Sequence, residues 1–150
     1  MTWLDDTLRT FSDCQRRGCP ADLVAAGFQC RGHEDGMPLL ALSHLRKAWS
    51  TSGEVVADLN RSQVLFDVLQ ALAEQGRLDA ETLYGAAWGL PWSNSRRNTV
   101  HVAVNRLRSK LGDGVLSLET LPDRTYRMTP AIALWTRPPG ARSAIVQPRE

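Results

Sequence analysis

Long apolar runs are absent from this 150-residue sequence. A membrane-spanning helix needs about 20 consecutive apolar residues, and no stretch of the chain approaches that length. The N-terminus, MTWLDDTLRTF, has neither the basic start nor the continuous apolar region of a secretory signal peptide. We therefore expect neither contact with a membrane nor export through such a signal.

Signs of catalysis are equally scarce. The three histidines, His33, His44 and His101, are scattered along the chain, and there is no glycine-rich phosphate loop. No pair of nucleophile and base can be recognised either. These absences argue against an enzyme, and we expect no cofactor.

Cysteine is rare, with three residues in the chain. An odd number of thiols cannot pair completely within one chain, which favours a reducing compartment. Cys14, Cys19, Cys30 and His33 form the one constellation of metal-ligating residue types, and such ligands suit zinc. Their spacing matches no established zinc motif. Buried structural cysteines are therefore the favoured interpretation, with a zinc site as the alternative.

Acidic residues are missing from one segment. The net charge of the whole chain is only +2, so any basic surface must be local. No Asp or Glu occurs from Arg96 to Leu111, a segment that contains Arg96, Arg97, Arg106, Arg108 and Lys110. Its apolar residues recur at the spacing of one helix face: Val100, Val104, Leu107 and Leu111. The pattern predicts a helix over 95–111, capped by Ser95 or Asn94 and ended by Gly112.

A helix with an aliphatic back and a basic front is typical of proteins that bind the major groove of DNA. An ordinary solvated helix face is the alternative. Solvated faces, however, usually mix charges of both signs to gain ion pairs one turn apart. The absence of acidic residues therefore favours a nucleic-acid surface.

The flanking sequence predicts an α+β fold. Upstream, the apolar spacing predicts a helix from Asn60 or Ser62 to Gly76, then a shorter helix from Asp79 to Gly89. Downstream, VLSLETL and RTYRMTP predict two strands joined in a hairpin. Residues 38–49 and 54–59 predict strands on either side of a turn. The shorter helix is expected to turn Leu83, Ala86 and Ala87 inward.

The order and residues of these elements resemble the OmpR/PhoB-type winged helix-turn-helix DNA-binding domain of bacterial response regulators. The resemblance covers about Leu39 to Pro130. It is carried by L-F-x-x-L-x-x-L-A from Leu65 to Ala73, by Leu83 with Trp88, by T-V-x-V-x-V-x-R-L-R-x-K-L from Thr99 to Leu111, and by Y-R-M from Tyr126 to Met128. It implies a short N-terminal antiparallel sheet, three helices and a C-terminal β-hairpin wing, in a cytoplasmic bacterial transcription regulator.

The resemblance also implies a function, namely sequence-specific binding of double-stranded DNA. The recognition helix 95–111 would enter the major groove, and the wing 115–128 would lie on the minor groove or the backbone. Members of the family commonly bind direct repeats as two subunits, which implies a homodimer on DNA. Some members contact RNA polymerase through the loop before the recognition helix. On that loop Trp92 is the candidate partner contact, unless its side chain folds over the core.

The candidate DNA contacts follow when the apolar stripe of the basic helix is turned inward. They are Arg96, Arg97, Thr99, Val102, Ala103, Arg106, Arg108, Lys110 and, in the wing, Arg124. Arg106 is the first choice for a bidentate contact with guanine, and Val102 is placed to meet a thymine methyl group. Arg97, Arg108 and Lys110 suit phosphates.

Three residues depart from the family pattern. Asn98 and Asn105 stand where many members carry arginine, and Thr125 replaces the glycine that usually precedes the wing tyrosine. If that glycine has a positive φ, a β-branched residue would be strained there. These departures argue against tight binding of DNA. A second, separate hypothesis is a winged helix that serves as a protein–protein interaction module, with its basic face on an acidic partner.

The chain is expected to divide into three parts. Residues 1–35 predict a helical N-terminal extension, too short for a phosphoacceptor receiver domain, and residues 36–130 a DNA-binding domain that folds alone. Residues 131–150 contain Pro138, Pro139, Gly140 and Pro148, a composition typical of a flexible tail.

Overall fold

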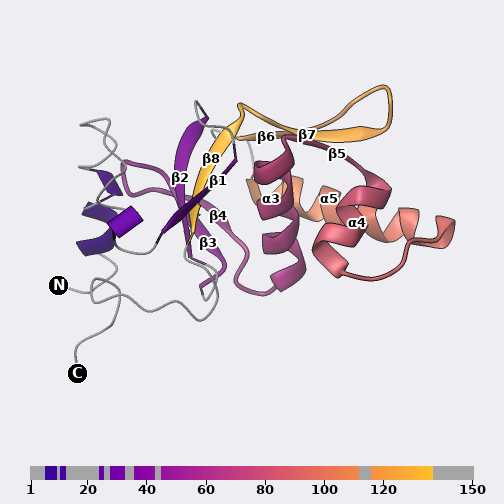
Figure 1. The fold of residues 1–150 in the computed structure, drawn as a ribbon, viewed down its shortest axis with the longest axis horizontal. Helices are drawn as coiled ribbons and strands as arrows, with labels where there is room; N and C mark the ends of the chain where they lie inside the picture. Colours follow the sequence, from indigo (N-terminus) through magenta and orange to yellow (C-terminus); the bar gives the residue numbers. More distant parts are fainter. Residues whose placement is uncertain are drawn as a thin grey trace.

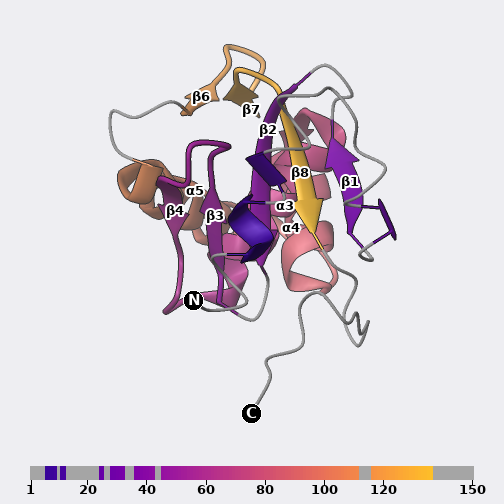
Figure 2. The same ribbon diagram turned by 90° about the vertical axis from the view of Figure 1, so that its left-hand side faces the viewer.

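In the described part of the chain, four strands follow the helical N-terminal residues, helices with one short strand among them come next, and three strands come last, in a mixed α+β fold shown in Figures 1 and 2. The structure is a computed structural model, and it describes residues 6–9, 11–12, 24–25, 28–32, 36–42, 45–111 and 116–136. The strands are β1 (Gln29–Gly32), β2 (Met37–Leu42), β3 (Lys47–Trp49), β4 (Val55–Asp58), β5 (Arg77–Asp79), β6 (Ser117–Thr120), β7 (Thr125–Thr129) and β8 (Ile132–Thr136). The helices are α3 (Gln63–Gln75), α4 (Ala80–Trp88), the short 3-10 helix η1 (Asn94–Arg96) and α5 (Arg97–Leu111).

The larger sheet has five strands in the order β1-β8-β2-β3-β4. Strand β8 lies parallel to β2 and antiparallel to β1, and all five of its residues are buried. The prediction of a flexible tail from residue 131 was therefore wrong for residues 131–136, because these residues belong to the fold. The prolines that follow β8 dominate the composition of this region and hide the short apolar strand that precedes them. Residues 137–150 lie outside the described part of the chain.

Both faces of this sheet are covered. On β2, Leu39 and Ala41 belong to the main core beside the helices, whereas Leu40 and Leu42 belong to a second apolar cluster on the opposite face. Figure 2 shows the helical N-terminal residues in front of this second face. A strand buried on both faces has no need to alternate apolar with polar residues. This explains why the segment around Leu40 shows no clean period of two.

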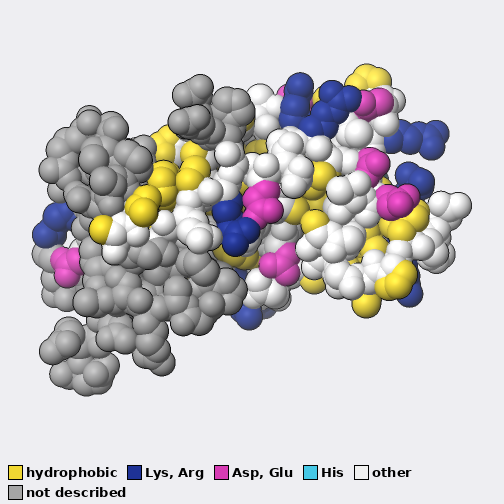
Figure 3. All heavy atoms as spheres, in the orientation of Figure 1, with side chains coloured by type: hydrophobic (Ala, Val, Ile, Leu, Met, Phe, Trp, Pro, Cys, Tyr) yellow, Lys and Arg dark blue, Asp and Glu magenta, His cyan; other side chains and the backbone are white. Residues whose placement is uncertain are grey.

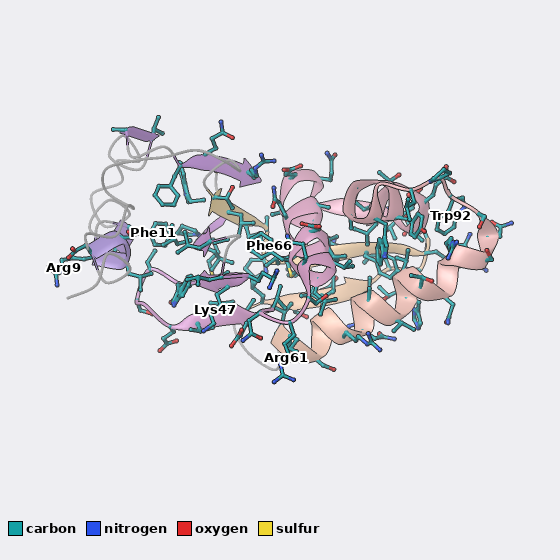
Figure 4. All side chains as sticks on the ribbon, turned by 90° about the horizontal axis from the view of Figure 1, so that it is seen from below. Arg9, Phe11, Lys47, Arg61, Phe66 and Trp92 are labelled. Carbon is teal, nitrogen blue, oxygen red and sulfur yellow. The ribbon has the colours of Figure 1, made fainter. Side chains whose placement is uncertain are left out.

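The second cluster includes residues from the predicted extension. Phe11 is completely buried, and Phe28 is 2% exposed, against Trp49 and Trp135 of the sheet. Figure 4 shows Phe11 between the N-terminal helical residues and the sheet. The extension is also not wholly helical, because Gln29–Gly32 form the edge strand β1. Residues before position 36 thus contribute to the core of the described fold.

Helices α3 and α5 pack on the other face of the sheet, α4 packs on α3 and α5, and the caps of these helices were largely predicted. The Ser62 side chain accepts a hydrogen bond from the Leu65 amide at the start of α3 (3.1 Å). Asp79 accepts one from the Thr82 amide at the start of α4 (2.8 Å). Gly76 and Gly89 end these helices with φ values of +78° and +67°, which glycine adopts at little cost.

Some local predictions were wrong. On α4, Ala86 is exposed, whereas Tyr84, which was not predicted to point inward, is buried beside Leu83 on the same helix face. Ser93, rather than Asn94 or Ser95, occupies the cap position of η1, and its side chain makes no capping hydrogen bond. The predicted stop at Gly112 lies outside the described residues.

The smaller sheet has three strands in the order β5-β7-β6. The β6–β7 hairpin was predicted, and β5 joins it from between α3 and α4, with Leu78 opposite Tyr126. A strand of three residues is too short to show a period in the sequence. In Figure 1 the hairpin extends above α4 and α5, so that the hairpin and α5 form one end of the molecule.

The burial of Phe11 generates a prediction about stability. We expect Phe11→Ala to lower the free energy of unfolding by about 3–5 kcal/mol, because it removes a large buried side chain and leaves a cavity. Val24→Ala is the matched control, since Val24 is 59% exposed and its truncation should change stability by less than about 0.5 kcal/mol. Urea unfolding followed by circular dichroism measures both. Equal effects of the two substitutions would show that the N-terminal residues do not pack on the sheet.

Candidate nucleic-acid interface

The aliphatic back of α5 is buried as predicted. Val100, Val104 and Leu107 are completely buried, and Leu111 is 7% exposed. Ala103 is also 7% exposed, which contradicts its predicted contact with DNA. Because Ala103 lies three residues after Val100 and four before Leu107, it shares their helix face. It therefore belongs to the core of the helical bundle.

The outermost stripe of α5 lies opposite the buried residues. Helical spacing puts Asn98, Val102, Asn105 and Ser109 there, and all four are exposed. Val102 is one of the few large apolar side chains with high exposure, at 38%. The outer face of α5 is therefore rotated from the predicted one toward Asn98 and Asn105, which are not among the predicted contacts. The spacing of the buried apolar residues in the sequence is enough to predict this orientation.

Cationic side chains flank this outer stripe. Arg97 lies on the side of the hairpin, and Arg106 lies on the side of α3, each lining a different hollow of the surface. In the described part of the chain, no ion pair engages Arg96, Arg97, Arg106, Lys110 or Arg124. The positive charge of these side chains is therefore available to an anionic partner.

The first hollow separates the start of α5 from the β6–β7 hairpin and has a volume of about 500 Å³. Its walls carry the cations Arg97 and Arg124 and no carboxylate. The remaining lining is Asn94, Ser95, Asn98, His101, Thr120, Leu121 and Tyr126. Burial raises the pKa of Tyr126, so its hydroxyl stays neutral near pH 7. The hollow can thus accept an oxyanion without any repelling charge.

The second hollow runs between α5 and the start of α3, with a volume of about 600 Å³. Apolar and polar side chains line it in equal number, and Arg61 and Arg106 supply positive charge. Figure 4 shows Arg61 beside α5. The lining residues are Arg61, Ser62, Val64, Leu65, Trp88, Asn98, Thr99, Val102, Ala103 and Arg106. The structure thus brings the predicted contacts Thr99, Val102 and Arg106 together along one side of α5.

Arg108 is a predicted phosphate contact that the structure uses differently. Its Nε donates to the Leu118 carbonyl oxygen and its Nη2 to Thr120 Oγ1, both at 2.9 Å, and its Nη1 donates to Asn105 Oδ1. Arg108 therefore fastens α5 to strand β6 with three of its five N–H donors, and its contact with a phosphate stays a prediction. Sequence spacing could not reveal this role, because the acceptors lie in another element.

Two further arginines of the three-stranded sheet are paired with carboxylates. Arg77 on β5 donates to Asp123 in the turn, and Arg127 on β7 contacts Glu119 on β6 at 2.6 Å. Figure 3 shows Lys and Arg atoms with acidic atoms beside them over the three-stranded sheet. Hydrogen bonds from Thr125 lower the pKa of Asp123, and the Arg127 guanidinium lowers the pKa of Glu119. These pairs brace the hairpin and are not counted among the free cations.

The hairpin turn places strain at Arg124. The Arg124 amide donates to the Leu121 carbonyl (2.9 Å) and the Leu121 amide to the Thr125 carbonyl (2.8 Å), with Pro122 in the first inner position. This is a type I turn followed by one left-handed residue. That residue is Arg124, with φ +68°, and not Thr125, where a missing glycine had been expected to strain the turn. Arg124 is exposed at the hairpin tip, as predicted.

Trp92 folds against α4. Its side chain is partly buried and packs on the main core. Its ring meets Tyr84 edge to face, with centroids 5.7 Å apart, and Tyr84 in turn stacks on Trp88 at 5.1 Å. Of the two alternatives for Trp92, the structure therefore shows the one in which its side chain folds over the core. Contact of Trp92 with a partner protein stays a prediction.

The predicted metal ligands fall mainly outside the described residues. Cys14, Cys19 and His33 lie there, and Cys30 is exposed on β1 rather than buried. Among the described residues, no group of three or more His, Cys, Asp or Glu side chains could hold a metal ion. No helix in the described ranges is both long and apolar enough to cross a membrane.

The positive φ of Arg124 generates a second prediction. Arg124→Gly should be more stable than Arg124→Ala by about 1 kcal/mol, because glycine adopts the left-handed region without a Cβ clash. Both substitutions remove the same charge, so the pair isolates the backbone effect. Urea unfolding of the two variants measures the difference. Equal stability, or a more stable alanine variant, would contradict the turn geometry.

Comparison with known proteins identifies no relative. No family model matches the chain, and neither a curated protein nor a solved structure matches it. Any function must therefore be argued from the site itself.

Proposed function

We propose that the part of the chain from β2 to β7 is a winged helix-turn-helix of the OmpR/PhoB type, and that it binds double-stranded DNA. In this proposal α5 is the recognition helix and enters the major groove. The β6–β7 hairpin is the wing and lies on the minor groove or the backbone. The protein would be a cytoplasmic bacterial transcription regulator rather than an enzyme.

The order of the elements supports this proposal. An antiparallel sheet, β2-β3-β4, precedes α3, and α3, β5, α4, α5, β6 and β7 follow in sequence. The recognition helix of a winged helix follows a shorter helix and precedes the hairpin, which is the position of α5. With 15 residues, α5 is about 22 Å long, enough to lie in the major groove.

One observation carries the proposal: the unpaired cations gather around the exposed face of α5 and the hairpin tip. Arg97, Arg106 and Lys110 flank the outer stripe of the helix, and Arg124 is at the tip. A surface of this kind suits the phosphate backbone, which supplies affinity through release of counterions. Other arginines of the same region, such as Arg108, are occupied by protein acceptors.

The roles of individual residues follow from their place on α5. Arg106 is near the middle of the helix, where its planar guanidinium can match the N7 and O6 acceptors of guanine. Val102 is exposed where a thymine methyl group could meet it. Asn98 on the same stripe can donate to and accept from adenine. Lys110 in the last turn suits a phosphate, as does Arg97 at the first turn.

Binding by two subunits belongs to the proposal. A single module of this kind buries on the order of 600–1,000 Å² of its surface against DNA, which gives limited selectivity. Two copies on a direct repeat would double the contacts. The alternative, a protein interaction module for an acidic partner, is separated from DNA binding by the experiment below.

A comparison of Arg106→Ala with Lys110→Ala tests the proposal. Arg106→Ala should cost about 1–3 kcal/mol on the preferred duplex and relax selectivity at one base pair. Lys110→Ala should weaken binding to preferred and random DNA alike and reduce the salt slope by roughly one unit. Fluorescence anisotropy at several salt concentrations measures affinity and slope together.

Lys47→Ala is the control for net charge, because it also removes one positive charge but lies in the five-stranded sheet, where Lys47 pairs with Asp58 at 3.9 Å. Its affinity and salt slope should equal those of the wild type. If Arg106→Ala and Lys110→Ala behave like this control, α5 is not a DNA surface. If instead they abolish binding of an acidic protein while DNA does not bind, the interaction-module alternative replaces the proposal.

A further inference from the structure

We propose that Trp92 is a positioning residue: its indole ring holds the Arg97 guanidinium at the wall of the hollow between α5 and the hairpin, where Arg97 takes a backbone phosphate of DNA. The inference rests on the proposed function and assigns a role to a loop residue outside the DNA-facing helix. Trp92 itself need not touch DNA.

The contact between the two side chains is direct. The Arg97 Cζ atom lies 5.6 Å from the centroid of the Trp92 ring, within the range of a cation–π interaction, for which tryptophan is the best aromatic partner. Arg97 is the first residue of α5 and also lines the hollow. The ring thus restrains a side chain that would otherwise rotate freely at an exposed helix start.

The ring is itself held in place. Trp92 meets Tyr84 edge to face at 5.7 Å, with 69° between the ring planes, and Tyr84 is only 2% exposed. Tyr84 also stacks on Trp88 at 5.1 Å. A continuous row of aromatic contacts therefore connects the buried core of α4 to the guanidinium. The loop that contains Trp92 gains its fixed position from this row.

A ring suits this task better than a carboxylate. An ion pair would orient Arg97 but would also cancel its charge, and a phosphate would then have to compete with the carboxylate. The quadrupole of an aromatic ring attracts the cation without adding a net charge. Asp79 is the nearby carboxylate: hydrogen bonds from Thr82 and the charge of Arg97 lower its pKa, but it accepts from Thr82 at the start of α4 and forms no ion pair with Arg97.

The hollow provides the matching site for a phosphate. Arg97 and Arg124 line it from α5 and from the hairpin, and no acidic residue takes part. Arg97 is also at the N-terminal end of a 15-residue helix, where the helix dipole favours an anion. Restraining Arg97 before DNA arrives reduces the side-chain entropy that binding must otherwise remove.

A double-mutant cycle tests this inference on the full chain. Trp92→Leu keeps an apolar side chain but removes the ring, Trp92→Phe keeps a ring, and Arg97→Ala removes the cation. Arg96→Ala is the matched control, because Arg96 is the neighbouring exposed arginine. Each variant is titrated with the same duplex at several salt concentrations, after circular dichroism has established that it is folded.

We expect Trp92→Leu to weaken DNA binding about two- to fivefold, the range that corresponds to one exposed cation–π contact. Trp92→Phe should restore most of this loss. Arg97→Ala should reduce the salt slope by about 0.9, the value for one phosphate contact. Adding Trp92→Leu to Arg97→Ala should have no further effect, and adding it to Arg96→Ala should keep its full effect.

A second measurement reports on the free protein and does not depend on DNA. The Arg97 side-chain protons should show an upfield ring-current shift in the NMR spectrum, lost in Trp92→Leu and retained in Trp92→Phe. An unshifted Arg97 in the wild type, or an equal effect of Trp92→Leu with and without Arg97, overturns the positioning role while DNA binding stands. A shifted Arg97 in a protein that does not bind DNA overturns the proposed function, and with it the role of Trp92 in DNA binding.

Discussion

The burial of one aliphatic stripe determines what α5 can present to a partner. Val100, Val104 and Leu107 are completely buried in the same core as the inward face of α3. Rotating α5 by one residue, about 100°, would expose these side chains and bury polar ones such as Asn105. Burying a side chain of this size contributes about 1.5–3 kcal/mol, so the rotation is strongly unfavourable. The position of every exposed cation on α5 depends on this packing.

The arginines around α5 form two groups with different roles. Arg77 and Arg127 pair with carboxylates and brace the hairpin, and Arg108 fastens the hairpin to α5. Exposed ion pairs contribute little to stability, and here they add to the strand pairing of β5, β7 and β6 that positions the hairpin. Arg97 and Arg124 face the hollow without a carboxylate. The arginines that hold the hairpin in place are thus different from those that face the hollow. In our proposal, Trp92 orients Arg97 without neutralising its charge.

Local patterns in the sequence predicted the helices, most of their caps and the hairpin. Strands β1, β5 and β8 were not predicted. Strands β1 and β5 have only four and three residues, and β8 precedes a proline-rich segment. The buried stripe of α5 was predicted apart from Ala103, whose small side chain gives a weak apolar signal, and the predicted outer face left out Asn98 and Asn105. The role of Arg108 could not be predicted, because its acceptors belong to β6. The contacts of Trp92 likewise depend on where α4 and α5 meet.

The most direct test of the account is selection of bound duplexes from a random DNA pool by the full chain. We expect enrichment of one short sequence, repeated in the same direction about one helical turn apart, with binding that weakens as salt rises. Half-sites of this kind would match a recognition helix that is held in one orientation. Recovery of unenriched DNA, bound weakly and without dependence on salt, would contradict the claim that α5 and the hairpin form a DNA-binding surface.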